Sequence, residues 1–294
     1  MKKINPNNIT LLLLVTLLIL SILNYNIVTE EILKYLKTFI EKLFPSTFII
    51  LTIGTLIINN NLLEKILNKT NKNISQIYIF IMSIISGFPS GSKYIKELLN
   101  KELITEKQAN NLIKSTHFPN PIFILNTSNI IFNSNKYPIK ILISIILSNL
   151  IIFIIYYKKE PINKKIETKN ISFINNLTKS INSTIKTLII IFGTNTLFII
   201  IFKLLTKYLK LNIYLYILLN GLFDLTDGIY KTVLIKNNIL KSIYIILFTS
   251  LGSIPIHFQV QSVLENTNVS NKNYLSGRIL GTILSIIIFL ILTK

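Results

Sequence analysis

Residues 86–92 read Ser86-Gly87-Phe88-Pro89-Ser90-Gly91-Ser92, a glycine-proline break at the end of an apolar run. A charged segment follows it at once, beginning at Lys93. Within a bilayer every backbone N–H and C=O needs a partner inside the protein, so such an interruption survives only where it is packed in protein or lines a polar cavity. A second break, Asn220-Gly221-Leu222-Phe223-Asp224-Leu225-Thr226-Asp227-Gly228, lies in the other half of the chain. We expect the two breaks to face each other and to form the functional centre of an integral membrane protein.

The composition is that of a membrane protein. The chain has 294 residues, 50% of them hydrophobic, and its mean hydropathy is +0.56. Its net charge of +19 comes from lysines that lie between the apolar blocks. This placement favours helix ends held at the interface over a continuous basic face for nucleic acid, so we predict no nucleic-acid partner. The absence of cysteine excludes disulfides, thiolate metal ligands and thiol nucleophiles.

The order of apolar and polar blocks predicts an all-α polytopic transmembrane helical bundle. A run at 9–23 has no small-residue cleavage site after it and is expected to remain as a first helix. Counting broken and re-entrant helices, we expect about seven to nine membrane segments. The predicted units are an N-terminal helix with an amphipathic segment (1–43), a first half (44–157), a basic cytoplasmic linker (158–170) and a second half (171–294).

The two halves share an order of features. Each glycine break precedes a polar helical stretch and then a proline break, at Pro119-Asn120-Pro121 and at Ser253-Ile254-Pro255. Interrupted short hydrophobic segments at matching places in two halves are typical of transporter binding sites. We therefore predict two repeated halves, either parallel or inverted. We also expect a helix to start at the capping box 105–108, the span 188–202 to be interrupted at 193–196, and a short helix at 229–241.

Two carboxylates stand out in the second break. Asp224 and Asp227 are three residues apart and could share one helix face, with Asn220 and Thr226 beside them. Carboxylates beside a membrane segment are costly and usually face a cavity or a partner, so these could accept from a cation, a proton or a sugar hydroxyl. The alternative is that they cap the start of a helix.

The two histidines and the single arginine allow several interpretations. His117 and His257 each lie beside a proline break, and Gln259 follows the second. Without cysteine or a metal-ligand spacing, we predict no metal site and no cofactor. Arg278 either anchors at the interface or pairs with an acid of the second break. A hydrolase built on Ser90 with a histidine and an aspartate is a further alternative, but the Gly-x-Ser-x-Gly pattern and a preceding strand are lacking, and we predict no enzyme.

Three ordered motifs carry a family resemblance. They are Gly87-Phe88-Pro89-Ser90-Gly91-Ser92-Lys93, the 220–228 stretch and Gly252-Ser253-Ile254-Pro255-Ile256-His257-Phe258-Gln259-Val260. From about Phe44 onward the chain resembles the sporulation integral membrane protein YlbJ family, built on Gate or nucleoside-recognition domains. The chain departs from that pattern at Lys101, at Pro255 and at Asp224. The resemblance implies a multi-pass bacterial plasma-membrane protein that is associated with sporulation and similar to parts of transporters.

We expect the chain to recognise a small polar solute or ion between the two glycine breaks, in contact with the bilayer, either as a monomer or as a homo-oligomer. The alternative is a membrane scaffold or sensor for spore formation that transports nothing. The predicted substrate-binding residues are Gly87, Pro89, Ser90, Gly91, Ser92, Asn120, Asn220, Asp224, Thr226, Asp227, Gly228, His257 and Gln259.

Overall fold

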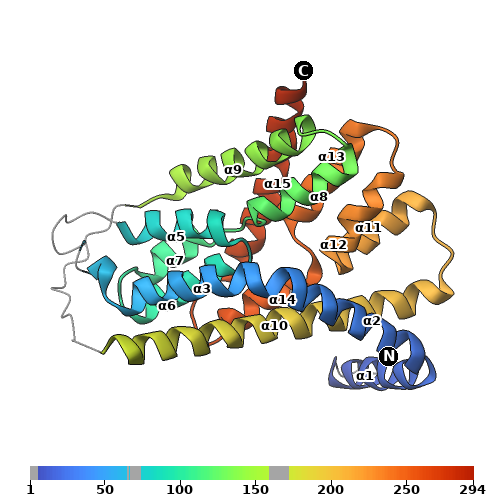
Figure 1. Cartoon of the computed structure of the whole chain (residues 1–294), viewed down its shortest axis with the longest axis horizontal. Coiled ribbons are helices and arrows are strands. Elements are labelled where there is room, and N and C mark those ends of the chain that lie inside the picture. The colour runs from blue at the N-terminus through green and yellow to red at the C-terminus, as the bar shows by residue number, and fades with distance from the viewer. Residues whose placement is uncertain (1–5, 65, 67–73, 159–171) are drawn as a thin grey trace.

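The computed structural model describes residues 6–64, 66, 74–158 and 172–294, and within these ranges every regular element is a helix (Figure 1). Among the described residues five helical segments are long and apolar enough to cross a membrane: Tyr25–Asn59, Lys136–Tyr156, Phe173–Tyr208, Asn238–Val263 and Asn271–Thr293. Shorter apolar helices lie at Thr10–Leu23, Ile74–Ser86, Pro121–Phe132 and Ile213–Phe223. The prediction of an all-α fold is confirmed for the described residues, and the five apolar helices agree with the prediction of a multi-pass membrane protein.

The spans are apolar outside and polar inside. In α9 (Lys136–Tyr156), Ile154 is 65% exposed while Ser148 and Asn149 are fully buried. In α15 (Asn271–Thr293), Ile291 is 65% exposed while Ser285 is fully buried. Large exposed apolar surfaces around a polar interior suit lipid on the outside and a hydrogen-bonded centre.

Two long pairs of helices run through the bundle. The helix α3 (Phe44–Asn59) packs along α10 (Phe173–Tyr208), and α9 packs along α15. Two shorter helices, α8 (Pro121–Phe132) and α14 (Ile254–Val263), pack against α9 and α10 respectively. The remaining elements are α1 (Pro6–Leu23), α2 (Tyr25–Thr38), η1 (Phe39–Leu43), α7 (Glu106–Leu112), η2 (Thr232–Leu234), α13 (Asn238–Ile246) and η3 (Leu247–Leu251).

Both glycine breaks form helical hairpins. The first joins α5 (Ile74–Ser86) to α6 (Ser90–Asn100), and the second joins α11 (Ile213–Phe223) to α12 (Leu225–Lys231); the two arms of each pack together. In Figure 1 the first hairpin lies on the left of the bundle and the second on the right. At 105–108 the predicted capping box is present, with Thr105 Oγ1 accepting from the Gln108 backbone and the Gln108 side chain accepting in return.

The helix α3 begins at Phe44 with Pro45 in its first turn, and the chain remains helical from Tyr25 to Asn59 through the π-helical turn η1. Two other predictions were wrong. The helix α10 is not interrupted at 193–196, because Thr194, Asn195 and Thr196 all bond back to carbonyls three or four residues earlier. The predicted helix at 229–241 is instead the end of α12, the turn η2 and a new start at Asn238, where Asn237 caps α13. The predicted linker lies outside the described residues except for Lys158.

Candidate functional site

The two proline breaks meet at the centre of the bundle. Gly252 has a φ of +91°, which favours glycine, and a Cβ added there would lie 3.1 Å from His117 Nε2. The segment before α8 and the segment before α14 therefore contact each other. We call this meeting point of residues 114–120 and 250–257 the crossing.

Arg278 joins the two segments of the crossing. Its guanidinium is fully buried and donates to three backbone carbonyls: to Lys114 O at 2.6 Å, to His117 O at 3.3 Å and to Ser250 O at 3.4 Å. Carbonyls freed by helix breaks need donors, and one planar guanidinium supplies several of them. Arg278 is thus neither an interface anchor nor an ion-pair partner of Asp224 or Asp227.

A tyrosine lies between the two histidines. The hydroxyl of Tyr274 is 3.0 Å from His257 Nδ1 and 3.4 Å from His117 Nδ1. The Phe88 ring stacks on the His117 ring at 4.9 Å. Among the described residues no group of three or more histidine, aspartate or glutamate side chains is placed to hold a metal ion. The histidines therefore take part in a hydrogen-bonded ring cluster.

Within the described part of the chain, five buried polar atoms at or beside the crossing have no hydrogen-bond partner. They are Thr116 Oγ1, His117 Nε2, Asn149 Oδ1, Ser253 Oγ and Arg278 Nε. All five residues are at most 4% exposed. Asn149 belongs to this cluster because its Nδ2 lies 3.5 Å from His117 O. Since buried polar groups are almost always paired, such a concentration of both donors and acceptors needs an explanation.

The first break packs directly onto the crossing. Phe88 N donates to Phe118 O at 2.7 Å. Gly87 has a φ of +75°, and an added Cβ would lie 2.7 Å from Asn120 N. A Cβ on Gly91 would lie 2.2 Å from Thr116 O. Glycine is required at both positions because the hairpin tip and the break before α8 touch backbone to backbone.

The hydroxyls of Ser90 and Ser92, which were predicted to bind substrate, donate hydrogen bonds within their own turn. Ser90 Oγ donates to Gly87 O, and Ser92 Oγ donates to Pro89 O at 2.6 Å. The Phe88–Pro89 peptide is cis. Ser90 is 1% exposed and Ser92 is 3% exposed. These side chains shape the tip of the hairpin, and its backbone forms the contact surface.

In the second break Asp224 caps the start of α12, which was the alternative to a binding role. Asp224 Oδ1 accepts from Thr226 N at 3.0 Å and from Asp227 N at 3.2 Å, which caps α12. Asn220 Nδ2 donates to Asp227 Oδ2 at 2.7 Å, while Asn220 Oδ1 is buried without a partner. A Cβ on Gly228 would lie 2.1 Å from Gly221 Cα, so the two arms touch at these glycines.

The two glycine breaks flank the crossing from different elements. The first touches the segment before α8, and the second touches η3, where a Cβ on Gly221 would lie 2.4 Å from the Phe248 ring. Among the described residues no hydrogen bond joins one break to the other. Their predicted face-to-face contact stays a prediction.

The remaining predicted residues have structural partners. Asn120 Oδ1 caps α8 by accepting from Ile122 N at 2.9 Å and from Phe123 N at 3.2 Å. Gln259 is buried, and its Nε2 donates to Thr194 Oγ1 of α10 at 3.0 Å.

Sequence reasoning missed Thr116 and Ser253 of the crossing, and Asn149 and Tyr274 beside it. The signal for Asn149 was present, because an amide in the middle of an apolar span is costly unless it faces the protein interior. The comparisons add no relative, since no family model, curated protein or solved structure matches the chain.

Proposed function

We propose that the chain is a transporter-like membrane protein that recognises a small polar solute at the crossing, between the two helical hairpins. The observation that carries this proposal is the set of five buried polar atoms, at or beside the crossing, that have no hydrogen-bond partner among the described residues. An unpaired buried donor or acceptor costs about 1–3 kcal/mol, so a solute or a water that pairs with several of them is favoured there. The mixed donors and acceptors suit a neutral or anionic polar solute better than a bare cation.

We further propose that the halves are repeats. The two halves have the same order of elements. The first half contains α3, the α5–α6 hairpin, α8 and α9, and the second contains α10, the α11–α12 hairpin, α14 and α15. Equivalent helices pair with each other, α3 with α10 and α9 with α15. The second arm of each hairpin packs on a helix of the other half: α6 packs on α14, and α12 packs on α8. Re-entrant hairpins that meet broken helices are the arrangement expected of transporter cores.

The proposed role includes no catalytic step. Ser90, the candidate nucleophile, donates its hydroxyl hydrogen to Gly87 O and is 1% exposed. Both histidines contact Tyr274, and no hydrogen bond joins either of them to Ser90 within the described residues. The plasma membrane, the sporulation role and membership of the Gate type rest on the three sequence motifs.

A non-transporting scaffold or sensor is the second candidate. This candidate is favoured because four side chains that were predicted to bind a solute are hydrogen-bonded to nearby backbone: Ser90, Ser92, Asn120 and Asp224. In this interpretation the breaks shape a rigid surface and bind no solute.

Flux measurements on the purified full-length protein separate the two candidates. The protein in detergent is first screened against nucleosides, amino acids, sugars and inorganic ions for a rise in its unfolding temperature. The classes that raise it are then tested for uptake into proteoliposomes. We expect saturable uptake of one class and its loss in the Ser253→Ala variant. If the protein binds no class of solute and sealed proteoliposomes take up none, only the scaffold or sensor candidate remains.

A further inference from the structure

A second polar site lies away from the crossing, between α6, α10 and α14. It is a cavity of about 690 Å³. Four lysines line it, Lys93, Lys96, Lys179 and Lys186, together with one acidic side chain, Glu97. Cavities of this size hold small molecules or headgroups. The excess of positive charge favours an anionic occupant.

The α10 wall is one continuous polar stripe. It includes Asn175, Thr178, Asn182 and Ser183, spaced so that they follow one face of the helix for about two turns. The acidic side chain is already engaged, because Glu97 Oε1 accepts from Ser183 Oγ at 2.9 Å. Hydroxyl and amide donors interleaved with ammonium groups are the chemistry that binds phosphate oxygens.

Lys93 makes this a built site and not only a basic surface. Its side chain is 3% exposed, and its ammonium donates to Thr184 Oγ1 at 3.1 Å. Among the described residues no carboxylate lies within ion-pair distance of Lys93. Burying an ammonium without a direct counter-charge costs several kcal/mol, and an anion in the cavity would offset that cost.

The other three lysines of the cavity have no ion-pair partner among the described residues. Lys179 and Lys186 of α10, both exposed, make no hydrogen bond or ion pair with any described residue. Lys96 Nζ donates to Glu265 O at 2.9 Å. These three cations could therefore turn toward one ligand without breaking an ion pair.

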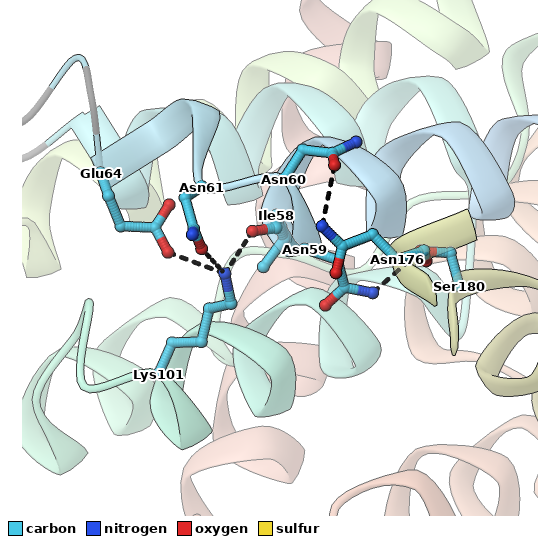
Figure 2. Close-up of polar contacts among 8 residues, drawn as sticks. All are labelled: Ile58, Asn59, Asn60, Asn61, Glu64, Lys101, Asn176 and Ser180. Atoms are coloured by element: carbon cyan, nitrogen blue, oxygen red, sulfur yellow. Dashed lines mark hydrogen bonds and ion pairs between the residues drawn. The ribbon is translucent and has the colours of Figure 1, made fainter. Parts of the chain in front are cut away.

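Polar contacts fix the helices that form the walls. Figure 2 shows Lys101 of the turn after α6 bonded to Ile58 O, to Asn61 Oδ1 at 2.7 Å and to Glu64 Oε1 at 2.7 Å. In the same view Asn176 of α10 donates to Asn60 Oδ1 at 2.9 Å, and Asn59 donates to Ser180 Oγ at 2.8 Å. The end of α3 thus holds α6 and α10 in place beside the cavity.

We propose that the α6–α10–α14 cavity binds a phosphate group, either on the headgroup of an anionic lipid or on a free phosphorylated solute. In Figure 1 α6 and the beginning of α10, which line the cavity, lie on the left of the bundle, the side on which α9 ends. The basic linker begins at this end, which we predict to be cytoplasmic, where both anionic lipids and phosphorylated metabolites are available.

The test uses delipidated full-length protein in neutral detergent. Inorganic phosphate is titrated in one arm, and nanodiscs of phosphatidylcholine with or without phosphatidylglycerol are compared in the other, with bound lipid measured by native mass spectrometry. We expect Lys179→Gln with Lys186→Gln to lower affinity for the occupant about tenfold or more, because both changes remove a solvent-exposed ammonium that can donate charge-assisted hydrogen bonds to phosphate oxygens. The buried Lys93→Met should abolish binding, and Lys236→Gln, an exposed lysine outside the cavity, should leave it unchanged.

Binding in only one arm identifies the source of the phosphate and supports the site. Absence of binding in both arms overturns the proposal, and so does equal loss in Lys236→Gln, which would show general charge attraction. The paired exposed lysines keep the test decisive if Lys93→Met fails to fold. Loss of solute uptake with retained phosphate binding would leave this proposal standing and count against the crossing alone.

Discussion

The hydroxyl of Ser253 offers a direct test of the crossing. It is fully buried, it has no hydrogen-bond partner among the described residues, and it makes no cap hydrogen bond to α14. Ser253→Ala removes this one oxygen and leaves the backbone contacts in place. The change therefore removes a group that makes no hydrogen bond to the described residues and lies where we place the solute.

The structure sets the expected magnitude. An unpaired buried hydroxyl costs about 1–3 kcal/mol, and the alanine forfeits only the dispersion contacts of one oxygen atom. We expect Ser253→Ala to raise the free energy of unfolding by about 1 kcal/mol. For a chain of this size that corresponds to a rise in unfolding temperature of roughly 2 °C. Solute binding and uptake should fall in the same variant.

The matched control is Ser285→Ala in α15. Ser285 is also fully buried, but its hydroxyl is 2.7 Å from Ser148 Oγ and 3.3 Å from Ser250 Oγ. Its loss should lower the free energy of unfolding by about 1 kcal/mol. Thermal unfolding in detergent measures both variants under the same conditions. If the two alanines lower the unfolding temperature equally, the Ser253 hydroxyl has a structural partner and our reasoning about the crossing is refuted.

Further substitutions test the contacts around the crossing. Gly91→Ala and Gly228→Ala should each destabilise the protein by about 1–3 kcal/mol or more, because the added Cβ overlaps neighbouring backbone. Gly193→Ala should instead stabilise α10 by about 0.5–1 kcal/mol, because nothing lies within 4 Å of the added Cβ. Thermal unfolding of the three variants checks this order. Arg278→Lys should lower the unfolding temperature nearly as much as Arg278→Met, because one ammonium cannot replace a planar donor that reaches three carbonyls; full stability of the lysine variant would contradict this. Asp224→Asn keeps the cap and should change stability by less than about 1 kcal/mol, so uptake at the wild-type rate would show that the carboxylate has no role in recognition.

Much of the helical layout could be predicted from the sequence, because glycine and proline mark it. Both glycine breaks, the start of α8 at Pro121 and the break at Gly252 lie where local backbone chemistry places them. The predicted interruption at 193–196 failed because the polar side chains there donate to carbonyls of their own helix and leave its backbone ladder intact.

The site was harder to predict because its decisive contacts are between distant segments. The capping role of Asp224 follows from its place before a helix, and the sequence carried that alternative. The role of Arg278 depends on carbonyls freed at two breaks far apart in the chain, which no local pattern reveals. The unpaired atoms of Thr116 and Ser253 are visible only once their surroundings are known.

The two proposed sites share the helix α6. Gly91, in its first turn, touches the backbone of Thr116 at the crossing, while Lys93, two residues later, lines the anion cavity. A rigid helix carries any displacement at one of these residues to the other, since both lie within one turn. Another wall of the cavity is α14, which starts at Ile254 and so also begins at the crossing. If both proposals hold, an anion held between α6 and α14 would bear on the two segments that we place around the solute, and the interrupted stretch 86–92 would then link recognition at the crossing to charge at the end of the bundle.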